Sequence, residues 1–193
     1  MSVVVAIPAR YASTRYPGKP LVALRGAAGG IRTLIERSWR AATEVRGVDR
    51  VLVATDDMRI AASAHGFGAE VAMTPESCAN GTERCAAVLD TLDTEPEIVV
   101  NLQGDAPLTP PWFVEALIGA LRDDPNADVA TPVLQCNGAM LDSLRTDRLA
   151  GRVGGTTAVF GTGGRALYFS KEVIPFTGAD YQPRAATPVW HHV

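Results

Sequence analysis

Three cationic side chains lie close together near the N-terminus, in a stretch that contains glycine and proline. They are Arg10, Arg15 and Lys19, within the string AIPARYASTRYPGKP. Fixed positive charge and backbone N–H groups at the end of a strand are what the phosphates of a nucleoside triphosphate require. A solvated basic turn is the alternative interpretation. Because ligands of α/β proteins bind at the carboxyl ends of strands, the position of this loop favours a phosphate-binding site.

The spacing in this loop matches neither of two common nucleotide-binding patterns. The Walker A spacing G-x-x-x-x-G-K-[ST] is absent, and Pro20 follows Lys19 directly. The dinucleotide fingerprint G-x-G-x-x-G is absent as well. Residue chemistry alone therefore predicts a phosphate-binding loop and leaves the nucleotide open.

A second group of polar residues follows a strand predicted over residues 97–102. Gln103, Gly104 and Asp105 come directly after it, in the string NLQGDAPLTPP. Magnesium commonly takes one or two carboxylates together with substrate phosphates, so Asp105 facing the basic loop could begin a metal site. A turn aspartate after glycine is the alternative. Because both loops leave the same edge of the predicted sheet, the metal site is the favoured interpretation.

A third candidate is the string NGTERC, at the start of a predicted helix. Thr82 could cap this helix, and Gly81 would allow a ligand to approach the backbone closely. Arg84 is equally consistent with a ligand contact and with a surface position. Asp56 and Asp57 could likewise do no more than end a strand and cap a helix.

Short β-branched runs alternate with amphipathic stretches, and this alternation predicts the elements that position these residues. It is typical of βαβ units around a mostly parallel, twisted sheet with helices on both faces, an α/β fold of three layers. We expect strands over residues 3–7, 50–54, 70–73, 97–102 and 128–133, and helices that begin near residue 33 and cover 58–64, 82–92 and 110–122. Beyond residue 134, repeated glycines predict turns in place of helices, with an antiparallel hairpin formed by 156–160 and 165–170.

Size and charge limit the domain organisation and the class of partner. The 193 residues, 47% of them hydrophobic, suffice for one core and do not demand two, so we expect a single domain over residues 1–193. The net charge of −3 comes from 18 basic and 21 acidic residues spread along the chain, which argues against a basic stripe for nucleic acid. A small-molecule partner fits better.

Targeting and cysteine patterns point to a reduced, cytoplasmic setting. The N-terminus lacks the features of a signal peptide, and the apolar run over residues 3–7 is too short for membrane insertion. Cys78, Cys85 and Cys136 have no C-x-x-C spacing, which argues against a disulfide framework and against a structural zinc site. We therefore expect a cytoplasmic protein with three reduced thiols.

Five strings, taken in order, resemble the CMP-Kdo synthetases, the 3-deoxy-manno-octulosonate cytidylyltransferases. They are AIPARYASTRYPGKPL, VATDD, NGTERCA, VNLQGDAPLTPP and ALYFSK. The resemblance is collinear and covers nearly the whole chain. It implies a nucleotide-diphospho-sugar transferase-like fold and a Mg²⁺-dependent reaction in which CTP and 3-deoxy-manno-octulosonate (Kdo) give CMP-Kdo and pyrophosphate for lipopolysaccharide assembly. In such a reaction the anomeric hydroxyl attacks the α-phosphorus, and the protein acts mainly by positioning and charge stabilisation.

The resemblance also implies roles for individual residues. Lys19, Arg10 and Asp105 would be catalytic, with Lys19 nearest the α-phosphate and Asp105 holding Mg²⁺. Gln103 and nearby backbone would read cytosine, and His192 matches a sugar-binding histidine. The residues expected to bind nucleotide or sugar are Ala9, Arg10, Arg15, Lys19, Thr82, Arg84, Gln103, Gly104, Lys171 and His192.

Three positions depart from the family pattern. Ala106 stands where an acidic residue usually follows the metal aspartate, Lys171 where arginine is usual, and Thr157 where a basic residue is usual. Lysine offers a carboxylate a point charge, whereas arginine offers a bidentate clamp. The exact sugar therefore stays open. The alternatives are a cytidylyltransferase for another sugar acid such as a sialic acid, a transferase that uses another nucleotide, and a truncated, non-catalytic nucleotide-binding protein.

Members of the family continue past the position of His192. The portion that follows supplies a second metal-binding aspartate, further sugar contacts and much of the dimer interface. We therefore expect this chain to lack the family's C-terminal portion, to bind CTP weakly and to turn over poorly, and the full-length protein to form a homodimer.

Overall fold

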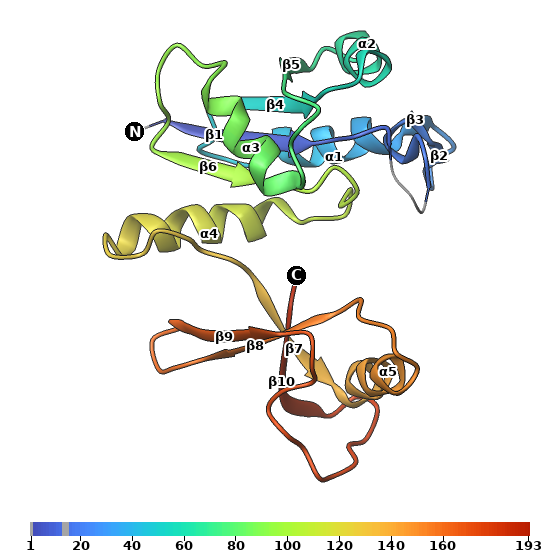
Figure 1. Cartoon of the computed structure of the whole chain (residues 1–193), viewed down its shortest axis with the longest axis vertical. Helices are drawn as coiled ribbons and strands as arrows, with labels where there is room; N and C mark the ends of the chain where they lie inside the picture. Colours follow the sequence, from blue (N-terminus) through green and yellow to red (C-terminus); the bar gives the residue numbers. More distant parts are fainter. Residues whose placement is uncertain (1, 13–15) are drawn as a thin grey trace. The chain divides into compact units, whose positions relative to one another are not determined.

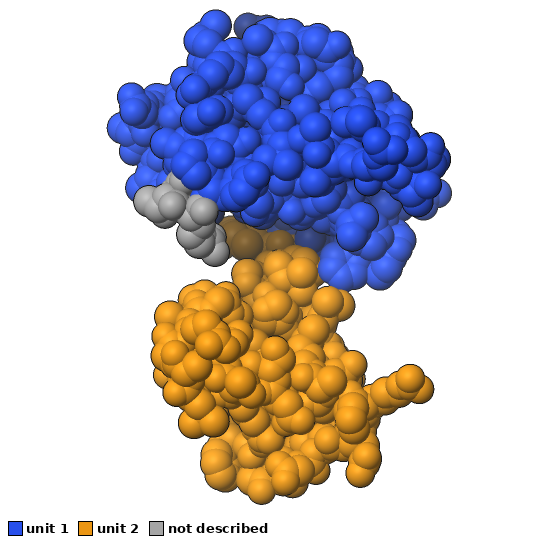
Figure 2. All heavy atoms as spheres, turned by 90° about the vertical axis from the view of Figure 1, so that its right-hand side faces the viewer, with its two compact units in different colours: residues 1–123 blue, residues 124–193 orange. Residues whose placement is uncertain are grey.

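The chain divides into two compact units, residues 1–123 and 124–193 (Figure 2). The computed structural model describes residues 2–12 and 16–193. The sequence led us to expect one domain, whereas each unit contains a hydrogen-bonded sheet of its own. Within the described residues, no helix has both the length and the apolar character that crossing a membrane requires.

The first unit is built around a parallel four-stranded sheet with the order β5-β4-β1-β6 (Figure 1). Its strands are β1 (Val3–Pro8), β4 (Arg50–Thr55), β5 (Glu70–Met73) and β6 (Ile98–Asn101). Its helices are α1 (Leu34–Thr43), α2 (Met58–Gly66), α3 (Gly81–Leu89) and α4 (Pro111–Asp123). Strand β1 lies in the middle and pairs in parallel with both β4 and β6. The strands predicted for this region are confirmed.

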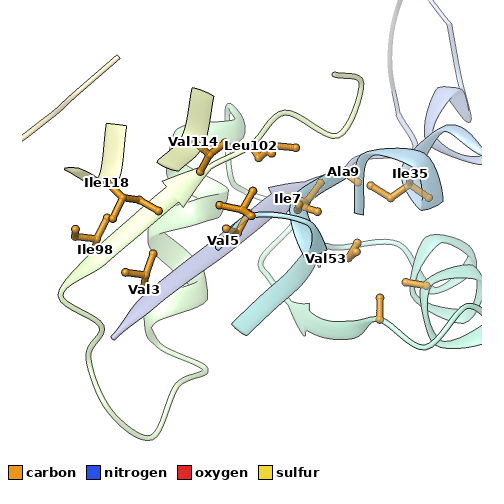
Figure 3. Packing of buried hydrophobic residues seen from close by; sticks show 14 of the residues in the cluster. Val3, Val5, Ile7, Ala9, Ile35, Val53, Ile98, Leu102, Val114 and Ile118 are labelled. Carbon is orange, nitrogen blue, oxygen red and sulfur yellow. The ribbon is translucent and has the colours of Figure 1, made fainter. Parts of the chain in front are cut away.

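Strand β1 explains why helices cover both faces of this sheet. Successive side chains of a strand point to opposite faces. Val3, Val5 and Ile7 pack in one cluster with residues of α1, α2 and α4 (Figure 3), whereas Val4 and Ala6 pack in another with residues of α3. All five side chains are almost completely buried. The predicted fold, a parallel sheet between two helical layers, is confirmed.

Capping side chains fix where the helices of this unit begin. Thr33, Asp57 and Asn80 each accept a hydrogen bond from a backbone N–H in the first turn of α1, α2 and α3. The capping role of Asp57 agrees with the sequence interpretation, and α1 begins near residue 33 as expected. The suggested cap at Thr82 is wrong, because α3 begins one residue earlier, at Gly81, and the side chain of Asn80 takes that role.

The second unit is an antiparallel four-stranded sheet with the order β7-β10-β8-β9, accompanied by one helix. Its strands are β7 (Val133–Asn137), β8 (Thr156–Phe160), β9 (Ala166–Ser170) and β10 (Ala186–His192), and its helix is α5 (Gly138–Leu149). Leu141 and Leu144 of α5 pack against Cys136 and Val189 of the sheet. The predicted hairpin is confirmed as β8 and β9.

Two expectations for the second unit are wrong. The strand expected over residues 128–133 begins only at Val133, because pairing with β10 starts there, where Val133 lies opposite His192. The region expected to contain only turns includes α5, because the glycines that argued against a helix lie beyond its last residue. Gly138, which opens α5, is needed there, since a Cβ would lie 2.3 Å from the carbonyl oxygen of Gln182.

Short elements follow the basic loop of the first unit. They are the 3-10 helix η1 (Lys19–Leu21) and a hairpin of β2 (Ala23–Arg25) and β3 (Ile31–Thr33). These elements were not expected from the sequence. The hairpin leads directly into α1, so it connects the end of the basic loop to the helix that packs beneath β1.

Candidate functional site

A pocket of about 300 Å³ opens in the first unit where β1 and β6 end. Three segments that are distant in the sequence contribute its polar lining. They are Ala9, Arg10 and Lys19 from the basic loop, Asn80, Gly81 and Arg84 from the start of α3, and Gln103, Gly104 and Asp105 after β6. The carboxyl edge of a parallel sheet is the usual ligand site of such folds. The three strings selected from the sequence therefore meet in one pocket.

Of the other predicted residues, three are not among those that line the pocket, one is not described, and Ala9 lines the pocket. Thr82 lies in the first turn of α3 and is not among the residues that line the pocket. Arg15 lies outside the described residues. Lys171 and His192 belong to the second unit. Ala9 lines the pocket, but its backbone N–H donates to the carbonyl of Ala54 at 2.9 Å, so this N–H is not available to a ligand.

Lys19 and Asp105 form an ion pair inside the pocket. The Lys19 Nζ donates to Oδ2 of Asp105, and the two side chains are 45% and 49% exposed. An ion pair with this exposure typically contributes about 0–1 kcal/mol, because water screens both charges. The pair therefore brings the predicted phosphate-binding cation and the predicted metal carboxylate together. A ligand that separates the two side chains loses little free energy by doing so.

Gly104 allows the loop after β6 to approach β1. A Cβ at this position would lie 2.7 Å from the carbonyl oxygen of Pro8, which is closer than real contacts permit. The Ser38 hydroxyl, buried on α1, donates to the Gly104 carbonyl at 2.9 Å. These contacts fix the backbone that presents Gln103 and Asp105 on either side of the glycine.

The side chain of Gln103 has a defined orientation. Its Nε2 donates to Oδ1 of Asn101 at 2.9 Å, and its Oε1 lies close to Gly81, 3.6 Å from where a Cβ would stand. A Cβ at position 81 would meet Gln103 only at ordinary van der Waals distance, and its tightest contact would be the Cγ of Pro8 at 3.2 Å.

Arg84 lines the pocket from a buried position, so the interpretation as a surface residue is wrong. Its side chain is 4% exposed. Nη1 donates to Oγ1 of Thr74 at 2.6 Å, and Nη2 lies 3.4 Å from Oδ2 of Asp56. A buried arginine keeps its charge and needs such partners. Arg84 is therefore held rigidly, and Asp56 does more than end β4.

The second oxygen of Asp56 is unusual. Its Oδ1 is buried and has no hydrogen-bond partner within the described part of the chain. The contacts of Arg84 with Asp56 and Thr74 were not expected from the sequence. The available signal was position: both partners directly follow strands, β4 and β5, that lie next to each other in the sheet.

Asp105 is the acidic side chain that lines the pocket. Among the described residues, His, Cys, Asp and Glu side chains form no group of three or more that could hold a metal. One carboxylate fits Mg²⁺, which commonly takes a single protein carboxylate and completes its shell with phosphate oxygens and water. The residues present are thus compatible with a metal that arrives with a phosphorylated ligand.

In the second unit, His192 is the last residue of β10, and Lys171 directly follows β9 of the same sheet. Lys171 Nζ donates to the hydroxyl of Thr156, and His192 Nε2 shares a hydrogen bond with the hydroxyl of Thr131, each at 2.7 Å. Burial lowers the pKa of His192, and the charge of Lys171 lowers it further. The hydroxyl of Thr157 donates to the backbone carbonyl of Glu172 at 2.6 Å.

The parallel sheet, with a cationic pocket at its carboxyl edge, defines an α/β protein suited to a phosphorylated ligand. Residues 4–188 match the family described as Cytidylyltransferase. The chain belongs to this family.

Curated relatives agree with the resemblance seen in the sequence. The chain is 45% identical, over 193 residues, to the 3-deoxy-manno-octulosonate cytidylyltransferase of Maricaulis maris (strain MCS10), covering 100% of this chain and 71% of that protein. It is 41% identical to the mitochondrial 3-deoxy-manno-octulosonate cytidylyltransferase of Arabidopsis thaliana, covering 90% of this chain and 55% of that protein.

A solved structure supports both the fold and the family. The structure of a CMP:2-keto-3-deoxy-manno-octonic acid synthetase complexed with CTP aligns with a TM-score of 0.79 and 33% identity. The alignment covers 100% of this chain and 74% of that one. The resemblance inferred from the five strings is therefore confirmed, while the roles of individual residues stay predictions.

Proposed function

We propose that this chain transfers CMP from CTP to 3-deoxy-manno-octulosonate, giving CMP-Kdo and pyrophosphate. The observation that carries the proposal is the convergence of Lys19, Arg84 and Asp105 on one pocket of a cytidylyltransferase domain. The identity of the proposed sugar acceptor is taken from the names of the Maricaulis and Arabidopsis relatives.

In the proposed binding mode, the triphosphate lies against the basic loop. Lys19 and Arg10 line the pocket there and provide charge-assisted hydrogen bonds to phosphate oxygens. The anomeric hydroxyl attacks the α-phosphorus, its O–P bond forms, the bond to pyrophosphate breaks, and the hydroxyl proton passes to solvent. Because charge develops on the phosphate oxygens, a lysine held beside them lowers the barrier.

The base is proposed to lie at the opposite wall of the pocket, next to Gln103 and Arg84. Both side chains line the pocket and are held by the neighbours Asn101, Thr74 and Asp56. Side chains that are already fixed lose little entropy when a ligand binds. This arrangement is suited to discriminate between bases.

Asp105 is proposed to hold Mg²⁺ together with oxygens of the bound phosphates. The cation supplies positive charge that compensates the charge of the phosphates. Asp105 pairs with Lys19. Binding of the triphosphate with its metal therefore requires the two side chains to exchange partners.

We further propose that Lys171 and His192 contribute to binding of the sugar acid, that the protein acts in the cytoplasm, and that two copies assemble into a homodimer. A lysine ammonium at position 171 suits a carboxylate without demanding bidentate geometry. For this reason a different sugar acid, such as a sialic acid, is the acceptor to compare with Kdo.

The test is pyrophosphate release by the purified chain from a panel of nucleoside triphosphates and sugar acids, with and without Mg²⁺. In line with the poor turnover expected from the sequence, we expect slow but measurable release that requires CTP, Kdo and Mg²⁺ together, with CMP-Kdo identified by mass spectrometry. A preference for a sialic acid would change the acceptor and keep the reaction. Thermal stabilisation by CTP without pyrophosphate release from any acceptor would contradict transferase activity and favour a nucleotide-binding protein.

A further inference from the structure

The proposed function leaves the string VATDD without a role for Asp57 beyond capping α2. Its carboxylate also binds the side chain of Arg59 through two hydrogen bonds, Nε to Oδ1 at 3.0 Å and Nη2 to Oδ2 at 2.5 Å. The backbone N–H of Arg59 donates to the same Oδ1 at 2.9 Å. Two parallel bonds between a guanidinium and a carboxylate fix the plane as well as the position of the guanidinium.

The guanidinium of Arg59 lies over the aromatic ring of Tyr11. Its central carbon is 3.3 Å from the ring centroid, well inside the range of a cation–π contact. Tyr11 is partly buried and also packs against the hydrophobic core of the first unit. The ring is therefore held between the core and Arg59.

Tyr11 in turn contacts the far end of the basic loop. The backbone N–H of Gly18 donates to the Tyr11 carbonyl at 2.9 Å. Gly18 has φ 70, a conformation that favours glycine, and a Cβ there would lie 3.1 Å from two carbons of the Tyr11 ring. The ring thus lies against the backbone directly before Lys19, and it joins the start of the loop to its end.

We propose that Arg59 is a positioning residue, which with Asp57 holds the ring of Tyr11 against Gly18 and so fixes the backbone that presents Lys19 to the triphosphate. The inference rests on the proposed function, in which this loop binds phosphates. Arg59 is not among the residues that line the pocket, so it acts through Tyr11.

The expected effect follows from the population of the binding-competent loop. When a loop is in its competent position for only a fraction of the time, the apparent affinity for its ligand falls by that fraction. Arg59→Ala should therefore raise KM for CTP by about 3- to 10-fold. KM for the sugar acid should stay unchanged, and so should the thermal unfolding midpoint, because the Arg59 side chain is 60% exposed and the cap of α2 remains.

Four variants separate positioning from direct binding. Tyr11→Phe keeps the ring and should behave as wild type, whereas Tyr11→Leu should match Arg59→Ala. Arg59→Lys keeps a cation over the ring but loses the bidentate contact, so it should recover part of the affinity for CTP. Arg40→Ala removes another exposed arginine that is paired with a carboxylate, on α1, and serves as the matched control.

The double variant Tyr11→Leu/Arg59→Ala gives the decisive kinetic comparison. If Arg59 acts through Tyr11, the double variant should have the same KM for CTP as Tyr11→Leu alone. A further rise of several-fold would show that Arg59 contacts the nucleotide itself and would overturn the proposal. An unchanged KM for CTP in Arg59→Ala would overturn it as well.

Hydrogen exchange at the Gly18 amide tests the proposal without any substrate. This amide is hydrogen-bonded to Tyr11, so Arg59→Ala should accelerate its exchange several-fold and Arg40→Ala should not. Unchanged exchange would overturn the positioning role. If Arg59→Ala accelerates this exchange but the wild-type chain neither binds nor turns over CTP, the positioning role stands. The proposed function is then refuted instead.

Discussion

Two cations that line the pocket are each paired with a carboxylate. Lys19 pairs with Asp105, and Arg84 pairs with Asp56. The two pairs differ in burial, since the Lys19 side chain is half-exposed whereas the Arg84 side chain is almost fully buried. Water screens the first pair more strongly than the second. Lys19 can therefore change partners during a reaction, while Arg84 is suited to stay in place.

Lys19→Ala should lower kcat/KM for CTP by at least about tenfold, because it removes a cation proposed to act on the phosphates in the transition state. The measurement is the initial rate of pyrophosphate release at several CTP concentrations. Arg25→Ala, which removes an exposed cation from the hairpin after η1, is the control. Turnover by Lys19→Ala at the wild-type rate would exclude this role for the lysine.

Gly104→Ala should destabilise the chain by about 1–3 kcal/mol, because the new Cβ would lie 2.7 Å from a backbone oxygen that has little room to move. Gly119→Ala in α4 is the matched control, since nothing lies within 4 Å of its Cβ and alanine favours helix. Urea unfolding of both variants measures the difference. A Gly104→Ala chain as stable as Gly119→Ala would show that the loop after β6 is not tightly packed.

Position along the sheet predicted Lys19, Gln103 and Asp105, because the ends of parallel strands meet at one edge. The same reasoning could have found Asp56, which also follows a strand. It could not have found that Arg84 is buried. A charged side chain in a helix usually faces solvent, and the partners that allow its burial lie on two other elements.

At the level of elements, the hydrogen bonds that begin α3 also hold two residues of the pocket wall in place. Asn80 Oδ1 accepts from the Glu83 backbone N–H at 2.9 Å, and Glu83 Oε2 accepts from the Ala79 backbone N–H at 2.8 Å. This reciprocal arrangement satisfies amides at the helix start. It also fixes the segment in which Asn80 and Gly81 line the pocket.

Asn80→Ala should lower the free energy of unfolding by about 1 kcal/mol, because the first turn of α3 loses its cap. Asn80→Ser should recover most of this loss, since serine caps nearly as well. Chemical unfolding followed by circular dichroism measures both. Equal stability of the alanine and serine variants would mean that the cap contributes nothing.

The sequence predicted the elements of the first unit better than those of the second. Strand β1 is a continuous apolar run, as expected for a strand covered on both faces. In the second unit, β10 contains Pro188 and ends in two histidines, so its composition does not favour a strand. In α5 only Gly138, Leu141 and Leu144 are buried, which leaves a weak helical pattern. Tertiary pairing decides these elements.

At the level of the whole molecule, two neighbouring histidines make the stability of the chain depend on pH. Burial lowers the pKa of His191 and of His192 below the ordinary value of 6.5. The unfolded chain therefore binds more protons than the folded chain when the pH lies between the lowered values and 6.5. The contribution of these two histidines to stability is complete above pH 6.5, and it is lost as the pH falls toward their lowered pKa values.

The midpoint of urea unfolding should thus be lower at about pH 5.5 than at about pH 7.5. Replacing both His191 and His192 by Gln should flatten this dependence, whereas His65→Gln, at an exposed position on α2, should leave it unchanged. If the double variant keeps the wild-type pH dependence, groups other than these histidines cause the change in the urea midpoint.

The strand order of the first sheet has a consequence for synthesis on the ribosome. Strand β1 is made first, yet its two neighbours are β4 and β6, and β6 ends only at Asn101. A nascent chain usually forms structure as its N-terminal part emerges. Here one edge of β1 stays unpaired until Asn101 has left the exit tunnel, which exposes backbone groups that attract other strands. The pocket, whose walls follow β1 and β6, consequently forms only after Asp105 has been translated.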